Sequence, residues 1–197
     1  QEIRDNRSTA ERAKADRLWA YGHVVVDEAQ ELSPMEWRMI MRRCPSRWMT
    51  LVGDTAQTGS PAGVDSWTDT LEPYVQNRFR RHQLTVNYRT PADIMDVANT
   101  LLPMIAPTQT PSQAVRSTGI PVRFLPSGTE VSPLIDALRT EHPDRLTAHI
   151  DADNVAEIKG LEYDHVVLVE PQEIVDNYPQ GWQDLYVALT RATQSLT

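Results

Sequence analysis

The sequence predicts an α/β fold built on parallel sheets. Short apolar segments alternate with segments whose apolar residues recur at helical spacing. Polar residues follow several of the apolar segments directly. Hydrophobic residues make up 40% of the 197 residues, which is enough for a sizeable core. Strands that alternate with helices form βαβ units, so we expect a parallel, doubly wound sheet.

The first predicted elements are two strands around a helix. Residues 24–26 (VVV) are β-branched, which predicts a strand buried on both faces. Ser33 and Glu36 have the spacing of a capping box around Pro34, and apolar residues follow at helical spacing. Residues 49–52 (MTLV) form the second predicted strand.

The rest of the chain repeats this pattern. A strand is predicted around residues 84–86, a helix opens at Thr90 and ends at Pro103, and residues 103–119 are a predicted loop. Further strands are predicted at residues 121–125, 146–150 and 165–169, and further helices from Ser132 onward and over residues 184–193. A boundary near residues 78–83 would divide the chain into domains of residues 1–80 and 81–197.

Composition excludes several classes of protein. The chain has 19 Lys and Arg against 27 Asp and Glu, and this net charge of −8 argues against wholesale coating of nucleic acid. The single cysteine, Cys44, excludes an internal disulfide framework and a cysteine-based zinc cluster. No segment predicts a membrane span or signal peptide, so we expect a cytoplasmic protein. The mixed charges of residues 2–19 predict a solvated helix or a frayed lead-in.

Polar clusters with phosphate chemistry stand at the ends of these elements. Asp27 and Glu28 follow the first strand, where two carboxylates can hold a hydrated Mg²⁺ and orient a water. Gln57 follows the second strand and could sense a terminal phosphate or position the water. Arg89 precedes a helix and Arg191 lies on the last helix, opposite its apolar side. Taken singly, the two carboxylates also fit a simple helix cap, and a lone helical arginine is usually solvated.

Five of these segments, taken in order, resemble consecutive motifs of superfamily 1 helicases of the UvrD/Rep type. The segments are residues 24–30 (VVVDEAQ), 53–57 (GDTAQ), 87–90 (NYRT), 159–163 (KGLEY) and 187–192 (VALTRA). Residues 84–98 and 159–171 carry a narrower likeness to the HelD branch. That branch comprises ATPases that bind bacterial RNA polymerase and release it from nucleic acid.

The resemblance implies RecA-like (P-loop NTPase) units, one partial and one nearly complete, that use ATP and Mg²⁺. It implies that Asp27 holds Mg²⁺ through water and that Glu28 acts as base or water-orienter. It also implies that Gln57 couples the γ-phosphate to movement, while Arg89 and Arg191 act as arginine fingers from the second unit.

The motif of residues 159–163 adds two nucleotide-binding positions by the same resemblance. Glu162 would contact the nucleotide ribose, and Gly160 would allow close backbone approach. Carboxylates in one unit and arginines in the other would allow hydrolysis only when the cleft closes. The partners implied are bacterial RNA polymerase and, through the intact protein, DNA or RNA.

Departures from the motif set qualify this expectation. No phosphate-binding loop of the form G-x-x-x-x-G-K-[ST] occurs, and the chain begins with Gln1, so we expect a C-terminal portion that hydrolyses no ATP alone. In UvrD-type helicases, aromatic residues that closely follow the motif of Gln57 stack on single-stranded bases. Here no aromatic residue stands between Gln57 and Trp67, and Trp67 could equally begin a helix capped by Ser66. Seventy residues separate Arg89 from the lysine of the KGLEY segment, too few for a large inserted domain.

Three functions remain after these departures. The first is a motor that remodels a protein partner, as in the HelD branch. The second is a DNA helicase or repair translocase, which would show salt-dependent binding to single strands. The third is a non-catalytic binding module that has lost its phosphate site.

Overall fold

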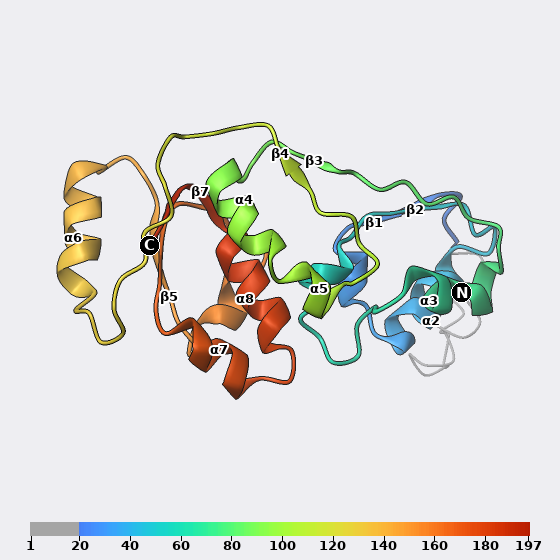
Figure 1. The fold of residues 1–197 in the computed structure, drawn as a ribbon. Coiled ribbons are helices and arrows are strands. Elements are labelled where there is room, and N and C mark those ends of the chain that lie inside the picture. Colours follow the sequence, from blue (N-terminus) through green and yellow to red (C-terminus); the bar gives the residue numbers. More distant parts are fainter. Residues whose placement is uncertain (1–19) are drawn as a thin grey trace, which may run out of the picture.

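The computed structural model describes residues 20–197. The mixed-charge segment of residues 2–19 therefore lies outside the described residues. Figure 1 shows two lobes, which we name by their elements. The N-terminal lobe contains β1 (Val24–Val26), η1 (Ala29–Glu31), α2 (Pro34–Arg43), β2 (Met49–Leu51), η2 (Thr55–Gln57) and α3 (Trp67–Val75).

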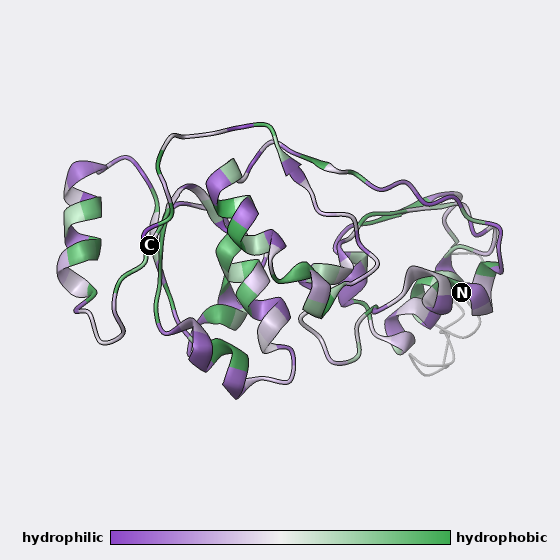
Figure 2. Ribbon diagram, in the orientation of Figure 1, coloured by the Kyte–Doolittle hydropathy of each residue, from purple (hydrophilic) through white to green (hydrophobic). Residues whose placement is uncertain are grey.

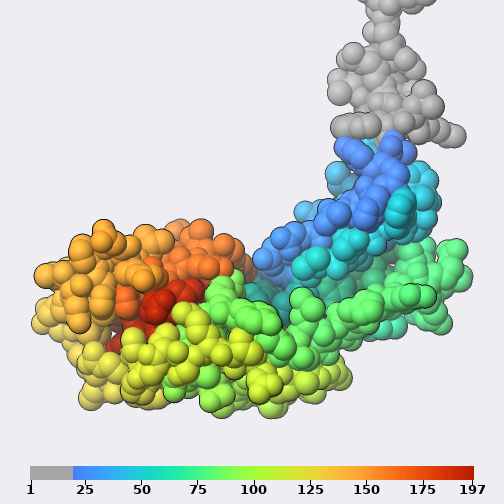
Figure 3. Space-filling model, turned by 90° about the horizontal axis from the view of Figure 1, so that it is seen from above, coloured from blue at the N-terminus to red at the C-terminus, as the bar shows by residue number. Residues whose placement is uncertain are grey.

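The C-terminal lobe contains the remaining elements. They are β3 (Val86–Asn87), α4 (Ala92–Asn99), α5 (Leu102–Ile105), β4 (Gln113–Ala114), α6 (Ser132–Glu141), β5 (Thr147–Ile150), η3 (Val155–Ile158), β6 (Tyr163–Leu168), α7 (Pro171–Asn177), α8 (Gly181–Thr190) and β7 (Ala192–Leu196). The segment between α3 and α4 runs from one lobe to the other (Figure 1). The lobes meet at an angle, which Figure 3 shows from above.

Every strand pair in the described part of the chain is parallel, which confirms the predicted fold class. The pairs form three separate sheets, ordered β1-β2, β3-β4 and β5-β6-β7. The predicted parallel, doubly wound arrangement is thus divided into three sheets among the described residues. No helix in residues 20–197 is long and apolar enough to cross a membrane.

Each lobe has its own hydrophobic core. In the N-terminal lobe, α2 and α3 bury residues such as Trp37, Met41 and Leu71 on one side of the β1-β2 sheet. In the C-terminal lobe the core surrounds α8, whose hydrophobic residues lie in the middle of the lobe (Figure 2). Ala56, from η2 of the N-terminal lobe, is fully buried within this second core. Two cores support the predicted division at residue 80, which stays a prediction.

Two helices begin where capping residues in the sequence predicted them to begin. The Ser33 hydroxyl accepts from the backbone N–H of Glu36 at 3.4 Å, and the Glu36 carboxylate accepts from the Ser33 N–H at 2.8 Å, so the capping box is confirmed. Ser66 caps α3 by accepting from the N–H of Asp69 at 3.3 Å. Trp67 therefore begins a helix and packs on the N-terminal core.

Several strand and helix predictions were wrong for physical reasons. Strand β1 is not buried on both faces, because α2 and α3 cover only one side of the β1-β2 sheet and Val25 is 68% exposed. Residues 121–125 form no strand, and only the N–H of Arg123 bonds to β7. The helix from Thr90 does not reach Pro103, which instead lies in the first turn of α5.

Candidate functional site

The predicted site residues lie at the boundary between the lobes. Parallel pairing of β1 and β2 places the segments that follow them side by side, and the N–H of Ala29 donates to the carbonyl of Val52 at 2.9 Å. Residues 27–28 and residues 53–57 are therefore neighbours on the N-terminal lobe. The C-terminal lobe contributes residues that precede α4, β6 and β7. Polar groups at the carboxyl ends of β1 and β2 can thus face a shared ligand with polar groups at the amino ends of β6 and β7.

Arg191 is the central cation of this boundary. It follows the last turn of α8 and is only 3% exposed, so the prediction that it lies opposite the apolar side of the helix was wrong. Its guanidinium donates to the carbonyls of Val187 and Leu161, both at 3.2 Å. Its third bond crosses the lobes, from Nη2 to Oε1 of Gln57 at 3.0 Å. The hydrogen-bond acceptors of this buried cation are all neutral.

Charges near Arg191 act in both directions. Burial lowers the pKa of Arg191, and the neighbouring Arg89 lowers this pKa further. The carboxylates of Glu28 and Glu162 oppose both effects. The site therefore gathers one further arginine and two glutamates around the buried guanidinium of Arg191, and an added anion would offset the desolvation of that charge.

Gln57 has its amide held in one orientation. Its Nε2 donates to Oδ2 of Asp54 at 2.9 Å, which leaves Oε1 facing Arg191. The other carboxylate oxygen of Asp54 accepts from the N–H of Ala56 at 3.0 Å and from the side chain of Gln109 at 3.0 Å. Asp54 thus caps η2 and fixes the amide that meets the arginine.

Arg89 forms an ion pair with Glu162, with 2.6 Å between Nη1 and Oε1. Asn87 shapes the turn that carries Arg89, because its side-chain oxygen accepts from the N–H groups of Arg89 and Thr90. The side chains of Arg89 and Glu162 are 38% and 51% exposed. An exposed pair of this kind contributes little net stability, about 0–1 kcal/mol, so either partner can exchange for a ligand.

Asp27 and Glu28 are exposed at the end of β1. Glu28 has a left-handed backbone conformation (φ 50°, ψ 36°). This conformation is energetically unfavourable for any residue other than glycine. Oδ1 of Asp27 accepts from the N–H of Glu28 at 3.0 Å, and Gln30 donates to Oε2 of Glu28 at 2.6 Å. Mg²⁺ commonly binds through one or two carboxylates plus water and phosphate oxygens, and these two side chains fit that donor set. No group of three ligating residues occurs in residues 20–197.

The structure thus joins most of the predicted residues in two contacts. Gln57 meets Arg191, and Arg89 meets Glu162. Gly160 has a φ of +74°, which gives the turn before Glu162 a conformation that favours glycine. The roles of all these residues, and of Asp27 as a metal ligand, stay predictions.

Sequence reasoning missed two groups at this boundary. Asp54 lies three residues after the end of β2, and an acidic residue soon after a strand, as Asp27 is after β1, is a signal that could have indicated it. Gln109 lies in a loop 55 residues further along the chain, and no local pattern indicates its contact with Asp54.

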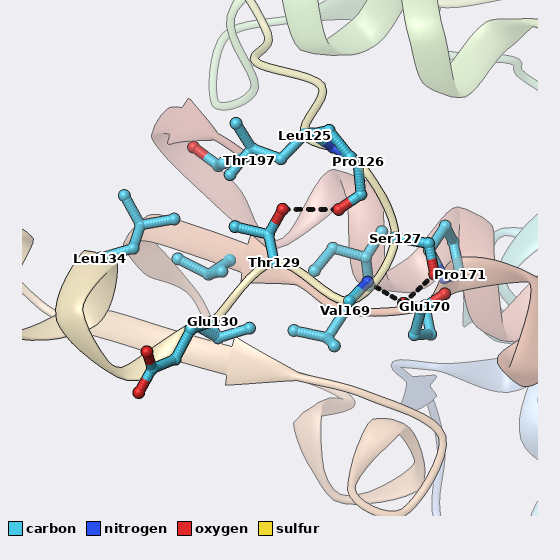
Figure 4. Close-up of a pocket in the computed structure, with 14 residues that line it drawn as sticks. Leu125, Pro126, Ser127, Thr129, Glu130, Leu134, Val169, Glu170, Pro171 and Thr197 are labelled. Carbon is cyan, nitrogen blue, oxygen red and sulfur yellow. Dashed lines mark hydrogen bonds between the residues drawn. The ribbon is translucent and has the colours of Figure 1, made fainter.

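A cavity of about 200 Å³ lies elsewhere, at the carboxyl end of β6 (Figure 4). The Glu170 carboxylate there accepts from the hydroxyl of Ser127 at 2.6 Å and the N–H of Gly128 at 3.1 Å. Arg191 and Glu162 precede β7 and β6, so they lie at the opposite end of the same parallel sheet. The cavity is therefore separate from the boundary between the lobes.

The chain is similar to known helicases. The family described as the viral superfamily 1 RNA helicase core domain matches residues 3–197. No curated protein matches the chain. Among solved structures, a complex of the arterivirus nonstructural protein 10 (helicase) with DNA has a TM-score of 0.53 and 21% sequence identity. The match covers 90% of this chain and 39% of that helicase, and at this identity it shows the fold alone.

These findings confirm the expected superfamily, while the HelD branch stays a prediction. The family that matches is the viral type, and nothing in the comparisons supports the HelD branch or RNA polymerase as a partner. The parallel sheets agree with a RecA-like helicase core. Because the match covers residues 3–197, the chain belongs to the viral superfamily 1 RNA helicase core family.

Proposed function

We propose that this chain is the distal part of an ATP-dependent superfamily 1 motor. The observation that carries the proposal is the buried guanidinium of Arg191, bonded only to neutral acceptors and reaching Gln57 across the lobes. A cation in this state favours an anionic ligand, and phosphoryl transfer is the chemistry that such a group accelerates.

The two lobes would divide the chemistry. Magnesium ATP, when bound, supplies the phosphoryl group that a water attacks. Asp27 would hold the metal through water, and Glu28 would orient the attacking water or take its proton. Arg191 would stabilise charge on the transferred group, and Arg89 would exchange Glu162 for a phosphate oxygen. Glu162, once released, would be available to the ribose. Hydrolysis then requires closed lobes, which couples turnover to domain motion.

The experiment measures ATP hydrolysis by the complete protein that contains this chain. Arg191→Ala should lower kcat by about 10³-fold or more, since one arginine finger can be worth about 10³–10⁵ in rate. Glu28→Gln should lower kcat by about 10²–10⁴-fold, the range typical of a general base. Arg139→Ala, which removes an exposed arginine of α6, is the matched control and should leave kcat unchanged. Full turnover in both site variants would reject the motor in favour of a non-catalytic binding module.

For the physiological partner, the finer proposal is bacterial RNA polymerase, which a HelD-like motor would release from nucleic acid. Support comes from Trp67, the first aromatic residue after Gln57, which packs on the N-terminal core. Trp67 is partly buried by this packing, which occupies part of the ring that would otherwise stack on bases. Affinity capture of RNA polymerase by the complete protein, with and without ATP, tests this proposal, and no enrichment in either state would reject it.

The second candidate is a nucleic-acid helicase or translocase. The family match supports it, and the arterivirus helicase was solved with DNA. It predicts ATP hydrolysis that single-stranded DNA or RNA stimulates, with binding that weakens steeply as salt rises. Hydrolysis without such stimulation would favour the protein-remodelling motor.

A further inference from the structure

A lysine of the C-terminal lobe lies against a glycine of the N-terminal lobe. Gly59 follows η2, and a Cβ added at Gly59 would overlap Nζ of Lys159. The N–H of Gly59 donates to the carboxylate of Glu31 at 2.8 Å, so this backbone is held in place. Lys159 can occupy its position only because residue 59 has no side chain.

The same lysine faces a buried carboxylate. Nζ of Lys159 is 3.6 Å from Oδ1 of Asp184, a residue of α8 that is only 7% exposed. Oδ1 of Asp184 has no hydrogen-bond partner. Burial raises the pKa of Asp184, Lys159 opposes this rise, and Glu31 adds to it from the other lobe. The ammonium of Lys159 is therefore the counter-charge of a buried carboxylate whose Oδ1 has no hydrogen bond.

The contacts of Lys159 resemble those of Arg191, because each cation links two segments of the C-terminal lobe and also meets the N-terminal lobe. Asp184 precedes Arg191 by seven residues, about two helical turns, so both project from one side of α8. Lys159 likewise precedes Leu161, whose carbonyl accepts from Arg191 at 3.2 Å. The same two segments of the C-terminal lobe are thus tied at two points. Both cations of these ties, Lys159 and Arg191, also meet the N-terminal lobe within residues 57–59.

We propose that Lys159, paired with Asp184 and seated on Gly59, is a lock that holds the two lobes together and positions Arg191 against Gln57. Lys159 is a positioning residue. It acts through its contact with Gly59, two residues after Gln57, and makes no contact with the predicted reacting groups. The inference rests on the proposed function in that closure of the lobes is the step it controls.

The test is a double-mutant cycle on the complete protein, with Gly59→Ala, Lys159→Met and both together. Lobe closure is followed by energy transfer between dyes at Met39 of α2 and Thr140 of α6, both exposed and each replaced by cysteine. Hydrolysis of ATP is followed in parallel as kcat and KM. Gly22→Ala is the matched control, because a Cβ at Gly22 has no atom within 4 Å.

Each single variant should lower the closed population by about tenfold, within the range of couplings between residues in contact. The double variant should lose no more than either single variant, since both remove one contact. kcat/KM should fall with the closed population, and the Gly22→Ala control should match the parent protein. Asp184→Asn should reproduce Lys159→Met, because it removes the charge that holds the lysine.

Two results would overturn the lock. One is a closed population in Lys159→Met equal to that of the parent protein, and the other is a double variant whose loss is the sum of the single losses. Urea unfolding of each variant shows whether it is folded at the assay temperature. If the parent protein hydrolyses no ATP, the proposed function fails while the energy-transfer cycle still decides the lock.

Discussion

Replacement of Arg191 should separate activity from stability. We expect Arg191→Met to abolish hydrolysis in the complete protein, yet to change the free energy of unfolding of this chain by no more than about 2 kcal/mol. A structural arginine would behave in the opposite way, because its removal would unfold the lobes before it affected chemistry.

The expected magnitude follows from the contacts of Arg191. Three hydrogen bonds are lost, each worth about 1.5–3 kcal/mol for a charged donor. Removing a buried cation recovers a desolvation penalty of several kcal/mol, and methionine retains most of the apolar contact. The carbonyl of Val187 keeps a donor, because the hydroxyl of Thr190 lies 3.0 Å away. Loss and gain therefore nearly cancel.

The assay is urea unfolding of the 197-residue chain beside turnover of the complete protein. Arg139→Met on α6 is the control for loss of a positive charge at an exposed position. Inorganic phosphate should stabilise the parent chain more than Arg191→Met, since it binds the folded state through the guanidinium. If Arg191→Met lowered the free energy of unfolding by more than about 4 kcal/mol and left turnover unchanged, this reasoning would be refuted, because Arg191 would then have a structural role only.

Three further predictions concern stability. Ser33→Ala removes the capping box with Glu36 and should cost about 1 kcal/mol in urea unfolding, whereas no loss would mean the cap is unimportant. Gly181→Ala should cost about 1–3 kcal/mol, because its Cβ would overlap two carbonyls of α7; a neutral effect would show that α7 can move. Burial lowers the pKa of His165, so its stabilisation is full above the unfolded pKa of 6.5 and declines as pH falls below it. His165→Gln, which can still reach the Ser195 hydroxyl, should flatten that decline in thermal unfolding, and an unchanged pH profile would contradict it.

Local signals predicted the elements that local chemistry determines. The capping box at Ser33 was correct because its partners lie three residues apart. Residues 121–125 (PVRFL) were wrongly assigned as a strand, since their apolar residues do not supply a partner strand. Strand β7 (Ala192–Leu196) was missed for the converse reason, because its sequence is mostly small and polar and pairing with β6 creates it.

In the candidate site, too, some contacts could be predicted from the sequence and others could not. The order of motifs placed Gln57, Arg89 and Arg191 at one boundary, and the structure brings Gln57 to Arg191 over 134 residues of sequence. Gln109 and the pair of Lys159 with Asp184 had no such signal. Their contacts depend on how two lobes dock, and docking leaves no periodicity or spacing in a single chain.

The loop of residues 54–59 carries the consequence of that docking. Three side chains of the C-terminal lobe meet it at separate positions: Gln109 at Asp54, Arg191 at Gln57 and Lys159 at Gly59. The loop itself is short and internally fixed, with Asp54 capping its start and Glu31 holding its end. An anion that drew Arg191 away from Gln57 would remove one of these three contacts between the lobes, which gives the site a physical route from ligand binding to the relative position of the lobes.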